Sequence, residues 1–162
     1  MTATENWDHS VDVLVVGSGN GGMTAAVCAH EMGTRDVLLI EKNPAFGGSS
    51  SISGGGVWAP CNRYARAVGA EDSRADALRY LEETVPADAV PHEMLETFLD
   101  MAPRMIDFLH QRTRVRYVTL PQYPDYYTNL PGARIGNRSL EPEPLMKSEL
   151  GAEAEHLVDT HH

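Results

Sequence analysis

The sequence predicts an α/β fold that begins with a β-α-β unit, and three observations support this. First, the apolar run Val13–Val16 is followed by a cluster of glycines. Second, an alanine-rich stretch follows the glycines and stops near Gly33. Third, another apolar run, residues 37–40, ends at an acid, Glu41. Short apolar runs bounded by glycine are typical of strands in a parallel sheet, and parallel strands need a crossover that is usually a helix.

The glycine cluster has the G-x-G-x-x-G spacing, formed by Gly17, Gly19 and Gly22. In dinucleotide-binding folds the first glycine allows a tight turn, the second lets the backbone approach a pyrophosphate, and the third lets the helix pack close to the sheet. The first helical amides lack intrahelical partners, and the helix dipole favours an anion beside them. We therefore expect a Rossmann-like site for dinucleotide phosphates, to which Ser18 and Gly21 of the same turn contribute.

An acid lies at the expected distance from this turn. Glu41 follows Gly19 by 22 residues, close to the roughly 20 residues typical of a ribose-binding acid. Its carboxylate can accept hydrogen bonds from both ribose hydroxyls and would repel a 2′-phosphate, which argues against an NADP-type cofactor. We expect the next residue, Lys42, to take part in cofactor binding as well.

Residues 47–56 are rich in glycine and serine. One interpretation is a flexible linker. The other is an ordered loop whose amides and hydroxyls surround a large polar ligand. The interleaved apolar residues favour it, because a solvated linker has little use for them: Phe46, Ile52, Val57 and Trp58. The candidate cofactor-binding residues in this segment are Gly48, Ser49, Ser50, Ser53, Gly54, Gly55 and Gly56.

Helices are predicted next. Ser73 and Asp76 have the spacing of a capping box, and an apolar stripe of helical period continues to Pro86. Pro91 begins another helical stretch. We expect Pro103 to interrupt it and Asp100 to cap a second helix, because a proline inside a helix removes a donor and clashes with the preceding turn.

The last third is predicted to be irregular after a short strand near residues 115–118. Five prolines and two glycines exclude long regular elements there: Pro121, Pro124, Pro131, Pro142, Pro144, Gly132 and Gly136. The aromatic cluster Tyr123, Tyr126 and Tyr127 lies in this third. From their residue type and spacing alone, these tyrosines are expected to cover the edge of a core.

Composition narrows the function classes. The 162 residues carry a net charge of −10, which disfavours binding to nucleic acid or to anionic membrane surfaces. The first ten residues lack the features of a signal peptide, and no apolar run approaches the roughly 20 residues of a membrane span. The two cysteines form no Cys-x-x-Cys motif, so we expect a reducing, cytoplasmic setting. The histidines have no ligand spacing, so we expect no metal site.

The segment that follows Glu41 and Lys42 resembles that of a known group of flavoproteins. Gly-Gly-x-Ser-x-x-Ser-Gly-Gly after Glu41 and Lys42 resembles the FAD domain of fumarate reductase and 3-ketosteroid dehydrogenase flavoproteins. The continuation through Val57-Trp58-Ala-Pro60 is most similar to the 3-ketosteroid Δ1-dehydrogenases, and the likeness extends to about Pro144. The resemblance implies FAD. Members that attach FAD covalently use a histidine before the second glycine pair, where this chain has serines, so it implies non-covalent binding.

The resemblance also implies a reaction. In this family a 3-oxosteroid loses a proton from C2 and a hydride from C1, the hydride passes to the flavin, and a separate electron acceptor reoxidises it. Tyr126 matches an active-site tyrosine that assists the proton-abstracting base. Tyr123 matches an aromatic residue that lines the steroid pocket.

Relative to this family the chain is expected to be incomplete. Residues 1–162 match the amino-terminal part of an FAD-binding domain, without the closing part of that domain or the substrate domain. Alone, the chain is expected to have little or no activity. Three alternatives stay open: another fumarate reductase-like FAD oxidoreductase, a non-catalytic dinucleotide-binding fragment, and an NAD-dependent dehydrogenase, which residues 47–56 disfavour. The sequence specifies neither the steroid, the electron acceptor nor the oligomeric state.

Overall fold

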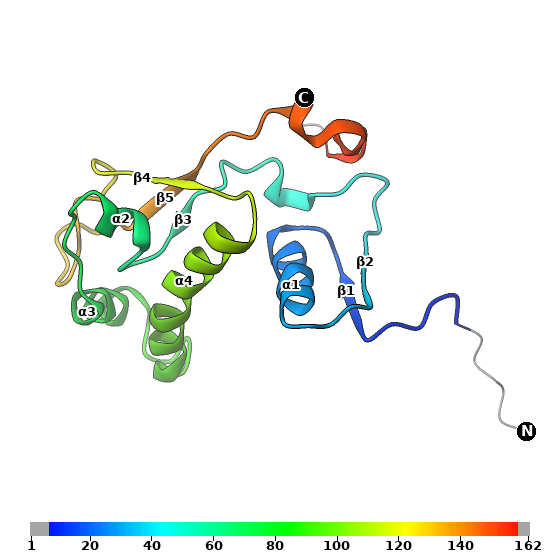
Figure 1. Ribbon diagram of the computed structural model, residues 1–162. Coiled ribbons are helices and arrows are strands. Elements are labelled where there is room, and N and C mark those ends of the chain that lie inside the picture. Colours follow the sequence, from blue (N-terminus) through cyan, green and yellow to red (C-terminus); the bar gives the residue numbers. More distant parts are fainter. Residues whose placement is uncertain (1–6, 159–162) are drawn as a thin grey trace, which may run out of the picture. The chain divides into compact units, whose positions relative to one another are not determined.

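The computed structural model describes residues 7–158, which form two compact units (Figure 1). The first unit contains the chain up to Ser53 together with the segment from Met146 onward. The second unit is Gly54–Leu145. The boundary therefore falls inside the glycine- and serine-rich segment 47–56.

The first unit contains the predicted β-α-β arrangement. Strand β1 (Val13–Val16) and strand β2 (Val37–Ile40) are parallel and pair in register, and helix α1 (Asn20–Glu31) connects them. The helix ends where Gly33 adopts a φ of +108°, a backbone conformation that favours glycine. The prediction of this unit from its apolar runs and glycines is confirmed.

The carboxyl-terminal segment returns to this unit. After the short helix η1 (Gly48–Ser50) and the whole second unit, the 3-10 segment η2 (Lys147–His156) leads back to Phe46. Phe46 accepts and donates backbone hydrogen bonds, from the amide of Val158 and to the carbonyl of His156, and so forms a bridge beside Leu157. This bridge attaches the end of the described chain to the start of the glycine-rich loop.

The second unit is built on a three-stranded antiparallel sheet in the order β3-β5-β4. The strands are β3 (Val57–Trp58), β4 (Tyr117–Thr119) and β5 (Ser139–Pro142). Helices α2 (Arg63–Ala67), α3 (Arg74–Thr84) and α4 (His92–Arg112) accompany the sheet (Figure 1). The core lies where α4 meets β4 and β5, and its buried members are Ala59, Ala102, Ile106, Tyr117 and Leu140.

The start of α3 follows the predicted cap. The Ser73 hydroxyl accepts a hydrogen bond from the Asp76 amide at 3.0 Å, which satisfies one of the unpaired amides of the first turn. In a capping box the second hydrogen bond joins the N-cap amide to the side chain three residues later. Here the Asp76 carboxylate accepts from the Ser73 hydroxyl instead, and the Ser73 amide donates to Asp72.

Helix α4 corrects the prediction of a break at Pro103. The helix runs without interruption from His92 to Arg112 with Pro103 inside it, and Asp100 caps nothing but pairs with Arg74. The reason is burial. Leu99, Ala102, Ile106 and Leu109 are all buried on one face that continues past the proline, and their removal from water offsets the lost hydrogen bond.

The last third has the short elements that its prolines predicted. A short strand was expected near residues 115–118, and strand β4 begins at Tyr117, two residues later than that expected start. Strand β5 ends at Pro142. Within residues 7–158, no helix is both long enough and apolar enough to cross a membrane.

Candidate functional site

The glycine turn after β1 has the close backbone packing that its sequence predicted. Gly17 has a φ of +98°, in the region that favours glycine. A Cβ atom on Gly22 would lie 1.9 Å from the Gly17 carbonyl oxygen, so no larger residue fits without backbone movement. The first helical hydrogen bond runs from the Met23 amide to the Gly19 carbonyl. The amides of Gly21 and Gly22 precede it and have no carbonyl partner inside α1.

Ser18 and Glu41 connect the ends of the two parallel strands. The Ser18 hydroxyl and amide both donate to Glu41 Oε2, at 2.5 and 2.9 Å, and the Asn43 amide donates to Oε1 at 3.0 Å. These bonds, that from the Ser18 hydroxyl first, lower the pKa of Glu41 to about 2. Glu41 is therefore a carboxylate at neutral pH, at the carboxyl edge of the sheet where open α/β folds bind ligands.

The glycine-rich loop is ordered against this turn, as the second interpretation of residues 47–56 predicted. The Gly47 amide donates to the buried Ser18 hydroxyl at 2.9 Å. Gly48 lies beside Gly19, since a Cβ on Gly48 would be 3.9 Å from the Gly19 Cα. The Ser50 hydroxyl accepts from the Asn20 amide at 3.0 Å, at the first residue of α1. Loop, turn and helix start therefore form one continuous polar surface.

Most of the predicted cofactor residues belong to the first unit. Those in the first unit are Gly17, Ser18, Gly19, Gly21, Gly22, Glu41, Lys42, Gly48, Ser49, Ser50 and Ser53. Lys42 and Ser49 are exposed, whereas Ser18 is buried and its hydroxyl bonds within the protein. Gly54, Gly55 and Gly56 belong to the second unit, where Gly54 and Gly56 line a pocket.

The donor set fits a dinucleotide. An anionic acceptor suits ribose hydroxyls, and unpaired amides at a helix start suit phosphate oxygens. No atom lies within 4 Å of a Cβ built on Gly21, so the space in front of this part of the turn is open to a ligand. The residues present thus match the groups that a dinucleotide offers.

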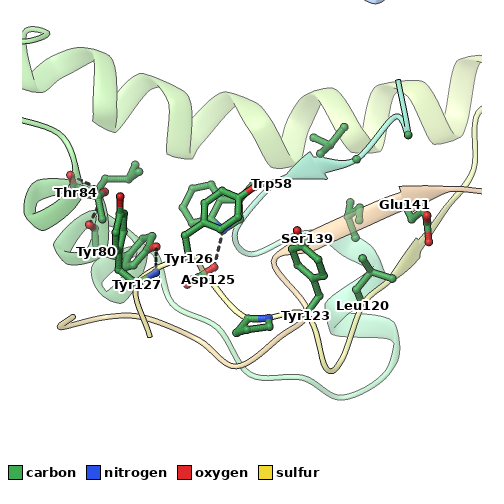
Figure 2. A pocket seen from close by; sticks show the side chains of 16 residues that line it. Trp58, Tyr80, Thr84, Leu120, Tyr123, Asp125, Tyr126, Tyr127, Ser139 and Glu141 are labelled. Carbon is green, nitrogen blue, oxygen red and sulfur yellow. Dashed lines mark hydrogen bonds between the residues drawn. The ribbon is translucent and has the colours of Figure 1, made fainter. Parts of the chain in front are cut away.

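A second candidate site lies wholly inside the second unit. It is a pocket of about 460 Å³ with an aromatic lining (Figure 2). Its walls come from β3, α3, β5 and the loop after β4, and the lining residues labelled in Figure 2 are Trp58, Tyr80, Thr84, Leu120, Tyr123, Asp125, Tyr126, Tyr127, Ser139 and Glu141. An apolar pocket with a few polar groups is typical of a small-molecule site.

The tyrosines that the sequence singled out lie at this pocket. Tyr123 is 48% exposed and Tyr126 is 87% exposed, so neither covers a core edge, which corrects the prediction made from the residues alone. A hydrogen bond with Tyr126 raises the pKa of the Tyr123 phenol. The Tyr123 phenol is therefore protonated at neutral pH.

Beneath these tyrosines lies a buried ionic network that sequence reasoning missed. Asp125 accepts hydrogen bonds from Trp58 Nε1 at 2.7 Å and from Arg138 Nη1 at 2.8 Å. Arg138 also donates to Asp72, at 2.8 Å from Nη2 and 3.1 Å from Nε, and its guanidinium carbon lies 5.7 Å from the Trp58 ring centroid. Asp125 and Arg138 are 4% and 1% exposed, so the network is part of the interior.

The protonation states of Asp72 and Arg138 are fixed by their pairing. Burial on its own would raise the pKa of Asp72, but hydrogen bonds from Arg138 and from the Cys61 amide lower it on balance. Burial likewise opposes the charge on Arg138, and Asp72 more than offsets it, so the pKa of the guanidinium is raised. Both groups are charged across the physiological range.

Sequence carried one weak signal for this network. Asp125 lies within the run Tyr123-Pro-Asp-Tyr126-Tyr127, and Arg138 lies within Gly136-Asn-Arg-Ser139. Both runs belong to the family resemblance, but their side chains are thirteen residues apart. Nothing in the spacing predicts that they pair.

Two of the histidines pair with other side chains. His92 Nε2 lies 2.8 Å from Glu82 Oε1, and His110 Nδ1 lies 2.8 Å from the Tyr64 hydroxyl. Across residues 7–158, no group of three or more His, Cys, Asp or Glu residues could bind a metal ion. His161 and His162 lie outside the described residues.

Comparisons with known proteins agree with this geometry. A family model described as an FAD binding domain matches residues 12–157. The 3-oxosteroid 1-dehydrogenase of Mycolicibacterium smegmatis is 40% identical over 146 residues, which are 90% of this chain and 25% of that protein. The 4-oxocyclohex-2-ene-1-carboxylate 5-dehydrogenase of Sinomonas cyclohexanicum is 40% identical over 142 residues, 88% of this chain and 23% of that protein.

A solved structure extends the likeness to three dimensions. The 3-ketosteroid Δ1-dehydrogenase of Sterolibacterium denitrificans, in complex with 1,4-androstadiene-3,17-dione, superposes with a TM-score of 0.87 at 38% identity. The match covers 93% of this chain and 26% of that chain. The chain thus spans about a quarter of the length of the relatives that it matches.

Proposed function

The chain belongs to the family of FAD binding domains, and from this premise we propose that it is the amino-terminal, FAD-binding part of an oxidoreductase that dehydrogenates ring A of 3-oxosteroids between C1 and C2. The observation that supports this most is the likeness to the steroid dehydrogenase of S. denitrificans, with Tyr123 and Tyr126 at one pocket. The activity itself is proposed for an enzyme that contains segments beyond the quarter matched here.

FAD binding is assigned to the Rossmann-like first unit. Glu41 would accept hydrogen bonds from the ribose hydroxyls, and the amides of Gly21 and Gly22 would donate to the pyrophosphate. Ser49, Ser50 and Ser51 stand where covalent relatives are expected to have a histidine, so the proposed attachment is non-covalent. FAD, when bound, supplies the acceptor for the hydride that leaves C1.

Residues of the second unit would handle the substrate. A proton next to a ketone is acidic enough to be removed when hydrogen-bond donors stabilise the developing enolate oxygen. Tyr126 would assist the base that takes the C2 proton, and Tyr123 would line the pocket. The C2 proton leaves to the base and the C1 hydride leaves with both electrons of its bond, which generates the C1–C2 double bond.

A second substrate class has support of its own. The name of the S. cyclohexanicum relative specifies dehydrogenation of a 4-oxo ring acid, at the same 40% identity as the mycobacterial protein. A small cyclic ketone is therefore the competing substrate. The cytoplasmic setting and a role as a non-catalytic fragment stay predictions from the sequence.

FAD binding is tested by titrating the chain with FAD and recording flavin absorbance and fluorescence. Wild type is expected to bind and to release FAD on denaturation, since no covalent bond forms. Glu41→Gln should weaken binding by about tenfold or more, because the ribose loses a charged acceptor. The exposed Asp36→Asn is the matched control and should bind like wild type. Equal affinity for Glu41→Gln and wild type would exclude the ribose-binding role.

Substrate class is tested by turnover of the enzyme that contains this chain, with an artificial electron acceptor. We expect a 3-oxosteroid to be dehydrogenated with higher kcat/KM than 4-oxocyclohexanecarboxylate or fumarate. Tyr126→Phe should lower kcat while flavin content is unchanged, and the exposed Asp88→Asn, which does not line the pocket, serves as the control. Preference for the ring acid would replace the steroid in this proposal.

A further inference from the structure

Beneath the pocket of the second unit, two buried charges fix the loop that carries Tyr126. We propose that Asp125 and Arg138 form a positioning pair, which sets Tyr126 and Trp58 at the walls of this pocket. The part of the proposal that concerns catalysis rests on the proposed function. The part that concerns the loop does not.

The first step is the environment of Asp125. It lies directly before Tyr126 in the chain, and its carboxylate is surrounded by three donors: Trp58 Nε1 at 2.7 Å, Arg138 Nη1 at 2.8 Å and the Arg134 amide at 2.9 Å. Its own amide donates to the Arg134 carbonyl at 2.9 Å. Backbone and side chain of this residue are therefore both fixed, and Figure 2 shows the bond between Trp58 and Asp125.

The second step is what supports Arg138. Its guanidinium donates to Asp125 on one side and to Asp72 on the other, and its Nη1 also donates to the Gly132 carbonyl at 2.9 Å. A planar guanidinium that donates from all three of its nitrogens in this way has one orientation. Gly132 itself packs tightly on α3, since a Cβ there would lie 2.0 Å from the Asp76 carbonyl oxygen.

The third step is the position of Tyr126 between two fixed points. Before it stands Asp125, and after it the Tyr127 amide donates to the buried Tyr80 hydroxyl at 3.2 Å. The Tyr126 side chain is itself 87% exposed. Packing around its own ring therefore contributes little to its placement, and the fixed backbone on either side determines the point from which its side chain extends.

The role follows from these contacts. A hydroxyl that must meet a reacting atom needs a fixed backbone, since small displacements of catalytic groups cost rate. A buried ion pair such as Asp125–Arg138 adds little to the free energy of unfolding by itself, because the desolvation of the two charges opposes their attraction. A buried pair at the base of an exposed, chemically active loop fits the positioning role.

The first experiment needs no activity. In the chain with Trp7→Phe, which leaves Trp58 as the single indole, NMR follows the Trp58 indole N–H and the exchange of loop amides. Asp125→Asn should move the indole resonance and speed exchange of the amides of residue 125 and Tyr127 by about tenfold or more. The exposed Asp88→Asn is the matched control and should change neither. Unchanged exchange and an unchanged indole resonance in Asp125→Asn would overturn the proposal.

Two variants that keep both charges of the pair test the proposal if Asp125→Asn does not fold. Trp58→Phe removes one donor to Asp125 and retains the aromatic ring, and Arg138→Lys retains the charge without the fork. If Asp125→Asn does not fold, both variants should still speed exchange at Tyr127. Wild-type exchange rates in both would contradict the proposal.

The second experiment uses the enzyme of the proposed function and a double-mutant cycle. Asp125→Asn should lower kcat by about tenfold or more and alter KM by less than about threefold, with flavin content unchanged. In a Tyr126→Phe background the same substitution should lower kcat by less than about twofold, since the hydroxyl it positions is gone. Losses that multiply would show that Asp125 acts independently of Tyr126 and would overturn the catalytic part. A wild-type enzyme without turnover would refute the proposed function, and the NMR experiment would then decide the positioning pair alone.

Discussion

At the scale of single residues, Ser18 connects the parts of the first unit. Its hydroxyl donates to Glu41 and accepts from the Gly47 amide, and it is 1% exposed. One side chain therefore joins the turn after β1, the acid after β2 and the glycine-rich loop. The sequence predicted Ser18 as a cofactor ligand, whereas its contacts indicate that it orients the acid that would bind the cofactor.

Ser18→Ala should raise the pKa of Glu41 from about 2 toward the ordinary 4.5, because the hydroxyl bond is the largest cause of the lowering. Because the pKa of Glu41 is lower in the folded than in the unfolded chain, its carboxylate stabilises the fold at pH values above the unfolded pKa. This contribution is lost as the pH falls through the folded pKa. The variant should thus lose part of the pH dependence of stability between about pH 2 and 4.5, because the amides of Ser18 and Asn43 still donate to Glu41. Carboxyl NMR titration measures the shift.

The same variant should be less stable at neutral pH by about 1–3 kcal/mol, because the Gly47 amide loses its buried acceptor. Ser49→Ala, at an exposed serine of the same loop, is the control and should keep both the pKa and the stability. A Glu41 pKa that stays near 2 in Ser18→Ala would contradict the role given to the hydroxyl.

At the scale of elements, the glycine turn permits a paired test. Gly22→Ala should destabilise the first unit by several kcal/mol, roughly as a severe backbone clash does, since its Cβ would lie 1.9 Å from a carbonyl oxygen. Gly21→Ala meets no atom within 4 Å and should stabilise α1 by about 0.5–1 kcal/mol. Hydrogen exchange of the β1 amides measures both. Equal effects of the two substitutions would exclude the packing role of Gly22.

Helix α4 offers a second test at this scale. Pro103→Ala should raise the free energy of unfolding by about 2 kcal/mol, because it restores a helical amide and removes a ring from the helix interior. The gain is reduced by the greater freedom of the unfolded chain. The exposed Gln111→Ala in the same helix should change stability by less than about 0.5 kcal/mol. Thermal or denaturant unfolding compares the two.

These elements also explain what sequence could predict. The β-α-β unit was predictable because strand, turn and helix signals are local and agree with one another. The break at Pro103 was wrong because a local rule was overridden by the buried face of Leu99 and Ile106, which sequence does not place. The Asp125–Arg138 pair was missed for a related reason, since it depends on how the loop after β4 folds back on β5.

At the scale of the whole molecule, the two units differ in how much apolar surface they bury. The second unit has a contiguous core around Ile106 and Leu140. In the described part of the first unit, Val15 is the only buried hydrophobic side chain, while Leu14 and Val16 on the same strand are 53% and 76% exposed. Since apolar burial is the main source of stability, the first unit should open more readily than the second.

Because the first unit buries so little apolar surface, we expect bound FAD to contribute to the stability of its fold. We expect the amides of β1 and β2 to exchange faster than those of α4 and β5 in the chain without FAD. FAD at about a hundred times its Kd should then protect the β1 and β2 amides by roughly 2.7 kcal/mol, because it binds the folded unit and not the open one. Glu41→Gln at the same FAD concentration should gain less protection, in proportion to its weaker affinity. Protection that rises equally in α4 and β5 would mean that the two units open together, and protection that does not rise in β1 would mean that FAD does not bind at the glycine turn.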